Sequence, residues 1–228
     1  MSGKEKIRPL LITIDGPAGA GKTTVSKALA ERLQYKYIDT GALYRGVAYE
    51  ILANDVDPQD ESALASLLNR LSLRFDRTPM GVRLMSGGAD ITEAIRTPEI
   101  TMLASAASAK PMVRHALLEL QRQLGAEKAA VFEGRDMGTV VFPDADVKFF
   151  LTADLNARAA RRYNEFKDRS AQSLDEVQKD MKRRDENDAS REVAPLKPAD
   201  DAVAIDSTDR TVDEVIDQMV AHIERISN

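Results

Sequence analysis

The segment from Leu10 to Leu33 constrains the fold more than any other part of the chain. It begins with the apolar run LLITIDG, passes through the turn GPAGAGKT and then places Val25, Leu29 and Leu33 four residues apart. A continuous apolar run rich in β-branched residues is typical of a parallel strand buried on both faces, and the four-residue spacing is typical of an amphipathic helix. The segment therefore predicts a strand, a tight turn and a helix.

The turn from Gly16 to Thr23 matches the pattern G-x-x-x-x-G-K-[ST] in full, between the strand and the helix that the pattern requires. Backbone N–H groups of such a loop surround phosphate oxygens, and the helix N-terminus adds a positive dipole end. We expect Lys22 to reach the outer phosphates of a nucleoside triphosphate and the Thr23 hydroxyl to bind Mg²⁺. A glycine-rich turn that merely contains a lysine is the alternative. The residues assigned to ATP in this loop are Gly16, Pro17, Ala18, Gly19, Ala20, Gly21, Lys22, Thr23 and Thr24.

Strands and helices continue to alternate along the chain. The runs YKYID, AVFEGRD, VKFFLTA and DAVAIDS are predicted strands. A last helix opens with a capping box, Thr211 with Glu214. The apolar face of that helix comprises Val212, Val215, Ile216, Met219 and Ile223. This alternation predicts an α/β fold with a parallel sheet wrapped by helices.

Two stretches depart from the alternation. The first, LSLRFDRTPMGVRLMSGGADI, alternates apolar and polar residues around turns at Thr78 to Gly81 and at Gly87 and Gly88, which predicts a small antiparallel insert. Helices are predicted after it, one with Thr97 as N-cap and one from Pro111 that ends before Gly125. The second stretch, Arg158 to Arg191, holds ten Lys or Arg and few apolar residues, such as Leu174, Val177 and Met181. We expect it to be a mobile lid.

Composition narrows the partners. The 228 residues suit one main domain with inserts, and a net charge of -5 disfavours DNA, RNA and membrane surfaces as partners. The chain has no cysteine and only His115 and His222, so disulfides and a thiolate zinc site are excluded. The short apolar run after Lys4, Lys6 and Arg8 resembles neither a signal peptide nor a membrane span. These features predict a cytoplasmic protein, and the lack of a heptad pattern favours a monomer.

Two further strand ends carry polar clusters. Asp39 and Thr40 end the second predicted strand, and Arg45 follows one turn into the next helix, where it can fork onto a second phosphate. An exposed helix arginine is the alternative for Arg45. Glu133 ends the strand AVFEGRD, where an acid often supports the magnesium shell, and Arg135 and Asp136 follow. Pairing of these two with each other or with lid charges is the alternative there.

Six segments together resemble the bacterial cytidylate kinases: ITIDGPAGAGKTT, IDTGALYR, EAIRTPEIT, ASAASAKPMVR, EGRDMGTVVFPDA and RRDENDASREVAPLKPAD. The resemblance runs from about Leu10 to the last helix, and GRDMGTVVFPDA is its most specific part. It implies a P-loop kinase core (1–65, 126–157 and 192–228), a monophosphate-binding insert (66–125) and a short helical lid (158–191) within one domain. The two irregular stretches fall where the family has its insert and its lid.

The resemblance also implies roles for individual residues. Thr40, where the family commonly has Ser, and Arg45 would contact the sugar and phosphate of CMP, and Arg135 its phosphate. Residues that would read cytosine are Ser105, Arg114 and Asp136, and lid residues that would hold phosphate and ribose are Arg184, Asp188 and Arg191. A carboxylate accepts from the cytosine N4 amino group, and an arginine donates to the ring acceptors. Glu133 stands where the family often has Asp or another acid, and a supporting role for the metal or the loop is implied for it.

On the ATP side, the resemblance places Arg158, Arg161 and Arg162 on the helix that faces the nucleotide, and Arg161 is the candidate that stabilises the transferring phosphoryl group. A solvated charged helix, with spaced pairs such as Arg162 with Glu165, is the alternative. The catalytic set is then Lys22, Arg161 and Arg135. The implied reaction is transfer of the γ-phosphoryl group of ATP to CMP or dCMP with Mg²⁺.

Two other functions fit the phosphate-binding loop alone, because this loop also occurs in switches and motors. The first is a kinase of another small molecule, such as shikimate, gluconate or a different nucleotide. The second is a binding or switch module whose nucleotide controls a partner protein.

Overall fold

The structure is a computed structural model that describes residues 8–78, 81–167 and 172–227. Its main sheet has five strands in the order β2-β6-β1-β7-β8. Their bounds are β1 (Leu11–Asp15), β2 (Lys36–Asp39), β6 (Ala130–Glu133), β7 (Val147–Thr152) and β8 (Val203–Asp206). Strand β1 pairs in parallel with β6 and β7, and β7 with β8. The predicted strands and the α/β fold class are therefore confirmed.

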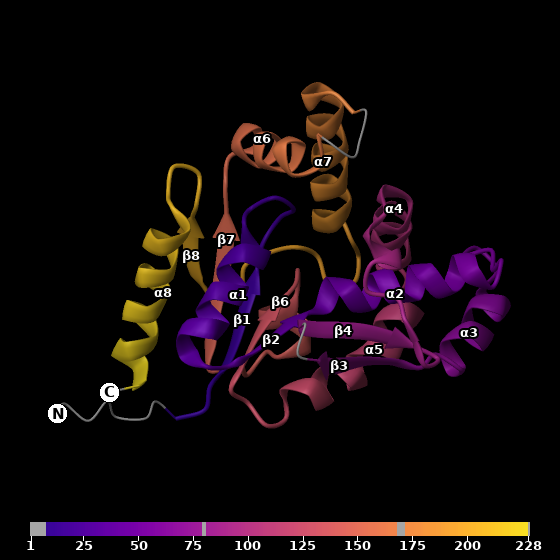
Figure 1. Ribbon diagram of the computed structural model, residues 1–228, viewed down its shortest axis with the longest axis horizontal. Helices are drawn as coiled ribbons and strands as arrows, with labels where there is room; N and C mark the ends of the chain where they lie inside the picture. The colour runs from indigo at the N-terminus through magenta and orange to yellow at the C-terminus, as the bar shows by residue number, and fades with distance from the viewer. Residues whose placement is uncertain (1–7, 79–80, 168–171, 228) are drawn as a thin grey trace. The chain divides into compact units, whose positions relative to one another are not determined.

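The apolar faces of two helices cover this sheet. Helices α1 (Lys22–Leu33) and α8 (Val212–Ser227) lie side by side against it (Figure 1). Ile12 and Ile14 of β1 are fully buried, as are Leu29 of α1 and Ile223 of α8, and they belong to one core cluster. Burial of β1 on both sides explains its unbroken apolar run, because a parallel strand has no solvated face.

The C-terminal helix begins as predicted. Thr211 Oγ1 accepts a hydrogen bond from Glu214 N at 3.3 Å, and the Glu214 carboxylate accepts from Thr211 N at 2.8 Å, so the capping box is present. One residue of the predicted apolar face is a correction: Val212 is 39% exposed. It is the first residue of α8, and the apolar face is buried from Val215 onward.

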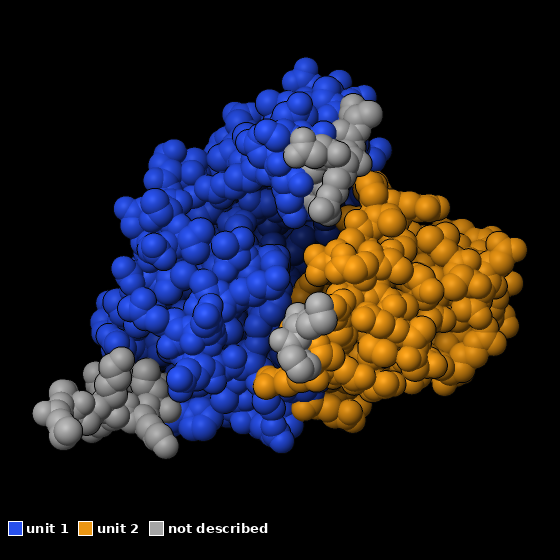
Figure 2. Space-filling view, in the orientation of Figure 1, with its two compact units in different colours: residues 1–38, 124–228 blue, residues 39–123 orange. Residues whose placement is uncertain are grey.

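The chain divides into two compact units, residues 1–38 with 124–228 (unit 1) and residues 39–123 (unit 2), which Figure 2 shows in different colours. The sheet belongs to unit 1 together with α1 and α8, except for Asp39 at the end of β2. Unit 2 holds helices and a small sheet. Its elements are α2 (Thr40–Ala53), α3 (Glu61–Asn69), β3 (Leu73–Thr78), β4 (Gly81–Ser86), β5 (Ala89–Asp90), η1 (Ala94–Arg96) and α4 (Pro98–Ala107); α5 (Pro111–Gly125) crosses the boundary.

The small sheet of unit 2 is the predicted antiparallel insert. Strand β3 pairs with β4 from Leu73 opposite Ser86 to Thr78 opposite Gly81, and β4 pairs with β5. Residues 79 and 80 of the predicted turn lie outside the described residues. Thr97 caps α4 as predicted, because its Oγ1 accepts from Ile100 N at 3.2 Å. Helix α5 includes Gly125, one residue beyond the predicted end.

The charged stretch expected to form a lid consists of α6 (Leu155–Phe166) and α7 (Leu174–Ala189); residues 168–171 of it lie outside the described part. Val177 and Met181 of α7 are buried with Ala159 of α6, whereas Leu174 is 43% exposed. Within the described residues, no helix has the length and apolarity needed to cross a bilayer.

Candidate active site

The loop between β1 and α1 adopts a backbone that depends on glycine. The φ angles of Gly16 and Gly19 are +147° and +73°, a region that other residues rarely adopt. A Cβ on Gly16 would also lie 2.0 Å from the carbonyl oxygen of Leu151. The chain can therefore turn sharply at the end of β1 and start α1 at Lys22.

Lys22 lies beneath this loop and is only 4% exposed. Its Nζ donates to the carbonyl oxygen of Pro17 at 2.8 Å. Burial and, after it, the charge of Arg135 lower the pKa of Lys22 from 10.5 to about 7, while Glu133 opposes the shift. A bound triphosphate would stabilise the charged form of this buried lysine, because a nearby anion favours the protonated amine.

Asp15, the last residue of β1, connects the loop to the strand end beyond β6. Its Oδ1 accepts from Met137 N at 2.9 Å and its Oδ2 from Gly138 N at 2.8 Å. These N–H groups begin the π-helical turn η2 (Met137–Val141). Burial raises the pKa of Asp15 to about 6, against the lowering effect of the two N–H groups. Asp15 thus fixes the segment that follows Arg135 and Asp136.

Glu133, at the end of β6, accepts hydrogen bonds from two hydroxyl groups. Thr23 Oγ1 donates to its Oε1 at 2.8 Å, and Tyr37 Oη donates to its Oε2 at 2.6 Å. Hydroxyl and carboxylate oxygens are ligands of the kind that Mg²⁺ prefers. This ion takes few protein ligands and completes its shell with water and substrate phosphates. In the described part of the chain, no three His, Asp or Glu side chains gather into a site of their own. Thr23 is therefore the residue that would hold a nucleotide-bound magnesium ion, with Glu133 supporting its hydroxyl.

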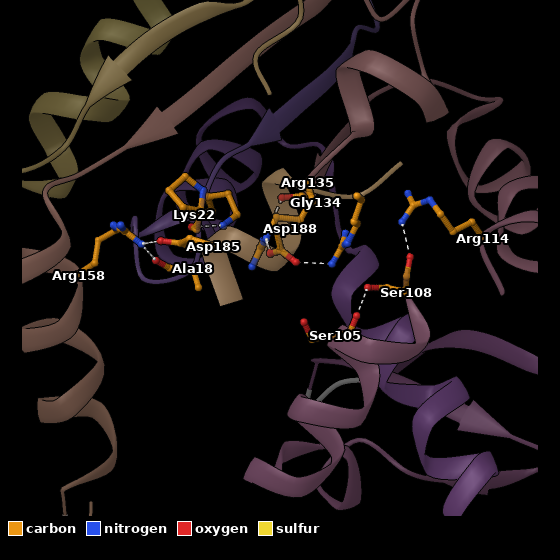
Figure 3. Close-up of polar contacts among 12 residues, drawn as sticks. Ala18, Lys22, Ser105, Ser108, Arg114, Gly134, Arg135, Arg158, Asp185 and Asp188 are labelled. Carbon is orange, nitrogen blue, oxygen red and sulfur yellow. Dashed lines mark hydrogen bonds and ion pairs between the residues drawn. The ribbon is translucent and has the colours of Figure 1, made fainter. Parts of the chain in front are cut away.

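Arginines from three segments surround the buried carboxylate of Asp188 on α7. Arg135 Nε donates to Asp188 Oδ2 at 3.0 Å, and Arg191 pairs with Oδ1 (Figure 3 shows the Arg135 contact). Burial alone would raise the pKa of Asp188, but the charges of Arg135, Arg191 and Arg184 hold it below its usual range. Arg135 thus pairs with a charged residue of the predicted lid, as in the alternative given for it. The cluster concentrates positive charge around one anion.

Helices α6 and α7 lie against the phosphate-binding loop. Arg158 NH1 donates to the carbonyl of Ala18 at 3.0 Å and to Asp185 Oδ2 of α7 at 2.5 Å (Figure 3). A Cβ on Gly19 would lie 2.6 Å from Cε of Met181, so α7 also covers the loop with an apolar side chain. Arg158 therefore bridges the loop and both helices.

Arg161 and Arg162 lie in different surroundings from Arg158. Arg161 donates to the carbonyl oxygens of Ser207, by a short bond of 2.5 Å, and Thr208 at 3.0 Å, after β8, and Ser207 Oγ donates to the carbonyl of Ala20 at 3.0 Å. Arg162 pairs with Glu165 at 3.2 Å, as in the charged-helix alternative.

In unit 2, Arg45 is held at the start of α2. Asp39 caps this helix, because its Oδ1 accepts from Ala42 N at 3.1 Å, and its Oδ2 accepts from Arg45 NH2 at 2.7 Å. Thr40 beside it is buried. Arg45 is thus a fixed guanidinium group rather than the solvated helix arginine of the alternative.

The junction of α4 and α5 in unit 2 fixes a second arginine. Arg114 is 8% exposed, and its NH1 donates to the carbonyl of Ser108 at 3.1 Å. Its guanidinium lies over the ring of Tyr44, 5.4 Å from the centroid, which is a cation–π contact. Ser108 Oγ in turn donates to the carbonyl of Ser105 at 2.8 Å (Figure 3). The predicted residues Ser105 and Arg114 are therefore linked through Ser108.

Each unit thus brings its own predicted residues together. Unit 1 gathers the loop with Arg135, Asp136, Arg158, Arg184, Asp188 and Arg191, and unit 2 gathers Thr40 with Arg45 and Ser105 with Arg114. Sequence reasoning missed the roles of Asp15, Tyr37, Asp185 and Ser207. Only Asp15 gave a signal, as an acid that ends a buried strand next to the loop.

Comparisons with known proteins concern the family and the fold of this chain. The family model described as cytidylate kinase matches residues 12–225. A cytidylate kinase of Geobacter sulfurreducens is 50% identical over 93% of this chain and 91% of its own length, and one of Bacillus subtilis is 43% identical over 96% and 99%. A shikimate kinase of Acinetobacter baumannii, solved with shikimate, has a TM-score of 0.50 at 15% identity and covers 96% of this chain and 95% of its own. At that identity the solved structure supports the fold alone.

Proposed function

The chain belongs to the cytidylate kinase family, and on this basis we propose how its residues carry out the reaction of that family. The reaction transfers the γ-phosphoryl group of ATP to CMP or dCMP and gives ADP with CDP or dCDP. A phosphate oxygen of the monophosphate forms the new bond to the γ-phosphorus while the bond from that phosphorus to the bridging oxygen of ADP breaks. No group is left over, so the protein needs only to align, neutralise and shield the reactants.

On the ATP side, the loop from Gly16 to Thr24 is proposed to cradle the phosphates, with Lys22 on the outer ones. Magnesium, held by Thr23 with support from Glu133, would supply charge neutralisation between the outer phosphates. Arg158 and Arg161 are proposed to face ATP. Arg158 bonds the carbonyls of Ala153 and Ala18, and Arg161 bonds those of Ser207 and Thr208, so either arginine would exchange such contacts for phosphate oxygens. Arg161 is proposed to stabilise the transferring phosphoryl group.

On the CMP side, guanidinium groups are proposed to hold the acceptor phosphate, since a planar fork matches two phosphate oxygens. The groups are Arg45, Arg135, Arg184 and Arg191. The observation that carries the proposal is the Asp188 cluster, because several arginines already converge on one buried anion. Asp188 itself is assigned to the ribose, and Thr40 to the sugar and phosphate.

Recognition of cytosine is assigned to Ser105, Arg114 and Asp136. Cytosine presents an N4 amino donor to the Asp136 carboxylate, whereas uracil presents a carbonyl oxygen there, which cannot donate a hydrogen bond to the carboxylate. A lost hydrogen bond to a buried charged group costs about 1.5–3 kcal/mol, enough for roughly ten- to a hundredfold discrimination.

The decisive experiment measures ADP release with CMP, dCMP, UMP, AMP, shikimate and gluconate as acceptors. CMP and dCMP should lead clearly, and replacement of Asp136 or Ser105 by Ala should reduce turnover of CMP while the affinity for ATP stays close to that of the wild type. A matched control is Ser66→Ala, an exposed serine of α3 whose hydroxyl bonds only the carbonyl of Ser62 among the described contacts. A panel led by shikimate or gluconate would refute the assignment.

A cytoplasmic location and a monomeric state complete the proposal. ATP and nucleoside monophosphates are metabolites of the cell interior, which favours that compartment for the enzyme. Light scattering coupled to size exclusion should give the mass of one chain, and a dimer mass would contradict the monomer.

A further inference from the structure

We propose that Tyr37 is a positioning residue for the magnesium-bound nucleotide. Its hydroxyl fixes the carboxylate of Glu133, and that carboxylate orients the hydroxyl of Thr23 toward the cation. The inference rests on the proposed function and adds to it a residue of β2 that the loop motif does not contain.

The carboxylate of Glu133 is held from two sides. Tyr37 Oη donates to Oε2 at 2.6 Å, and Thr23 Oγ1 donates to Oε1 at 2.8 Å. Glu133 is 8% exposed, so water has little access to replace either donor. With one hydroxyl on each oxygen, rotation of the carboxylate would break both bonds, and its plane is therefore fixed.

The direction of the Thr23 bond explains why this matters for a cation. A hydroxyl has one proton and two acceptor lone pairs. The O–H of Thr23 points at Glu133 in a hydrogen bond, which leaves both lone pairs of the hydroxyl oxygen on the side away from the carboxylate. A metal ion needs those lone pairs, and a proton in their place would repel it.

Tyr37 is itself held in place. Lys36 N donates to the carbonyl of Ala129 at 2.8 Å, which ties β2 to the start of β6, the strand that ends in Glu133. Lys27 Nζ of α1 stands 5.6 Å from the centroid of the Tyr37 ring. The phenol therefore has a defined position relative to both the helix that carries Thr23 and the strand that carries Glu133.

The alternative is that the Tyr37 hydroxyl only satisfies a buried carboxylate and contributes stability. The two roles differ in their dependence on magnesium. A stabilising bond affects ATP binding equally with and without the metal, whereas a positioning bond affects only the contribution of the metal.

The test is calorimetric binding of ATP to Tyr37→Phe, once with Mg²⁺ and once with EDTA. Partners of metal ligands typically contribute tenfold or more to metal affinity, so we expect Mg²⁺–ATP to bind roughly tenfold more weakly and metal-free ATP to bind within about twofold of the wild type. Tyr35→Phe is the matched control, because among the described residues its hydroxyl contacts only Leu10 N and the Arg8 carbonyl, both at 3.1 Å, and neither affinity should change.

A second comparison uses Glu133→Gln with and without Tyr37→Phe. If Tyr37 acts through Glu133, its substitution should have little further effect on Mg²⁺–ATP affinity in the Glu133→Gln background. Equal weakening of ATP with and without Mg²⁺, or full additivity of the two changes, would overturn the inference.

The acceptor assay separates this inference from the proposed function. A wild type that phosphorylates CMP, together with a Tyr37→Phe variant whose Mg²⁺ contribution is intact, overturns the inference alone. A wild type that does not phosphorylate CMP, with a Mg²⁺ contribution lost in Tyr37→Phe, overturns the proposed function and supports the inference.

Discussion

Burial and nucleotide binding shift the pKa of Lys22 in opposite directions. Its pKa is lowered from 10.5 to about 7, chiefly by burial and then by Arg135. At neutral pH the lysine of the free protein is thus partly uncharged. The anionic phosphates of ATP favour its charged form, so nucleotide binding must raise the pKa again.

We predict that ATP binding takes up protons at about pH 8, where the free protein holds Lys22 mostly neutral although a solvent-exposed lysine would be charged. Calorimetry in buffers of different ionisation enthalpy measures this uptake directly. Lys22→Ala should lose it, and Lys36→Ala, which removes a surface lysine paired with Glu127, should retain it. Equal uptake in the Lys22→Ala variant would contradict the assignment.

The pKa of Asp15 is shifted in the opposite direction to that of Lys22, and this shift makes the stability of the protein depend on pH. Its pKa is raised from 3.8 to about 6, so the folded state binds a proton more tightly than the unfolded state between these values. Its contribution to the free energy of unfolding is therefore complete below pH 3.8 and is lost as pH rises through about 6, by on the order of 3 kcal/mol.

We predict that wild-type stability falls relative to that of Asp15→Asn between about pH 4 and pH 6 and then runs parallel to it. Urea titrations at several pH values measure both proteins. The difference between them isolates Asp15 from other acids that titrate in this range. Parallel stability curves throughout would show that the Asp15 pKa is not raised.

Sequence reasoning found those site residues whose neighbours along the chain identify them. Lys22 and Thr23 follow from a local pattern of eight residues. Tyr37 and Asp15 do not, because their partners lie 96 and 122 residues away along the chain. A contact at that distance exists only through the fold, and an isolated tyrosine in a strand has no signal for it.

At the scale of elements, the hydrophobic periodicity predicted which way side chains face better than it predicted where each buried face begins and ends. The apolar runs of β1 and β7 identified buried strands, since burial on both faces leaves no polar alternation. The spacing in α8 correctly indicated Val215 and Ile223 as buried, but Val212 is exposed. Helical spacing says which way a side chain points and does not say where the sheet beneath it ends.

The contact of α7 with the phosphate-binding loop gives a prediction at this scale. Asp185→Asn removes the ion pair with Arg158, whose side chains are 21% and 9% exposed. A hydrogen bond between charged groups at such a site contributes about 1.5–3 kcal/mol, so amide exchange in α7 should accelerate roughly tenfold or more. Hydrogen-exchange mass spectrometry of residues 174–189 measures the change.

The control is Asp180→Asn on the same helix. Asp180 pairs with Arg183 at 3.0 Å on the surface, where an ion pair contributes little. Exchange in that variant should stay close to that of the wild type. If both variants accelerate equally, helix propensity rather than the Arg158 contact explains the effect.

For the whole molecule, the sequence predicted the α/β class, the parallel sheet and the antiparallel insert, because each has its own periodicity. The strand order did not follow from it. Strand β1 lies between β6 and β7, both distant in sequence, and no local pattern encodes which distant strand is the neighbour. The division into units at residues 39 and 123 is likewise a property of the folded chain.

Nucleotide binding should stabilise the whole molecule by mass action. At a Mg²⁺–ATP concentration of about one hundred times Kd, the free energy of unfolding should rise by about 2.7 kcal/mol, and the melting temperature should continue to rise with each further increase in concentration. Differential scanning calorimetry measures this shift. Lys22→Ala should melt close to the nucleotide-free wild type and show little shift, and a shift of wild-type size in that variant would place ATP elsewhere.

The pairing of β1 with β6 has a consequence for synthesis of the protein. Leu11 pairs with Ala130, so β1 leaves the ribosome about 120 residues before the strand it pairs with. At roughly 5–20 residues per second, translation leaves this apolar strand without its partner for on the order of ten seconds. The uninterrupted stretch from 39 to 123 emerges completely in that interval, so a nascent chain stalled just after it would present β1 to chaperones.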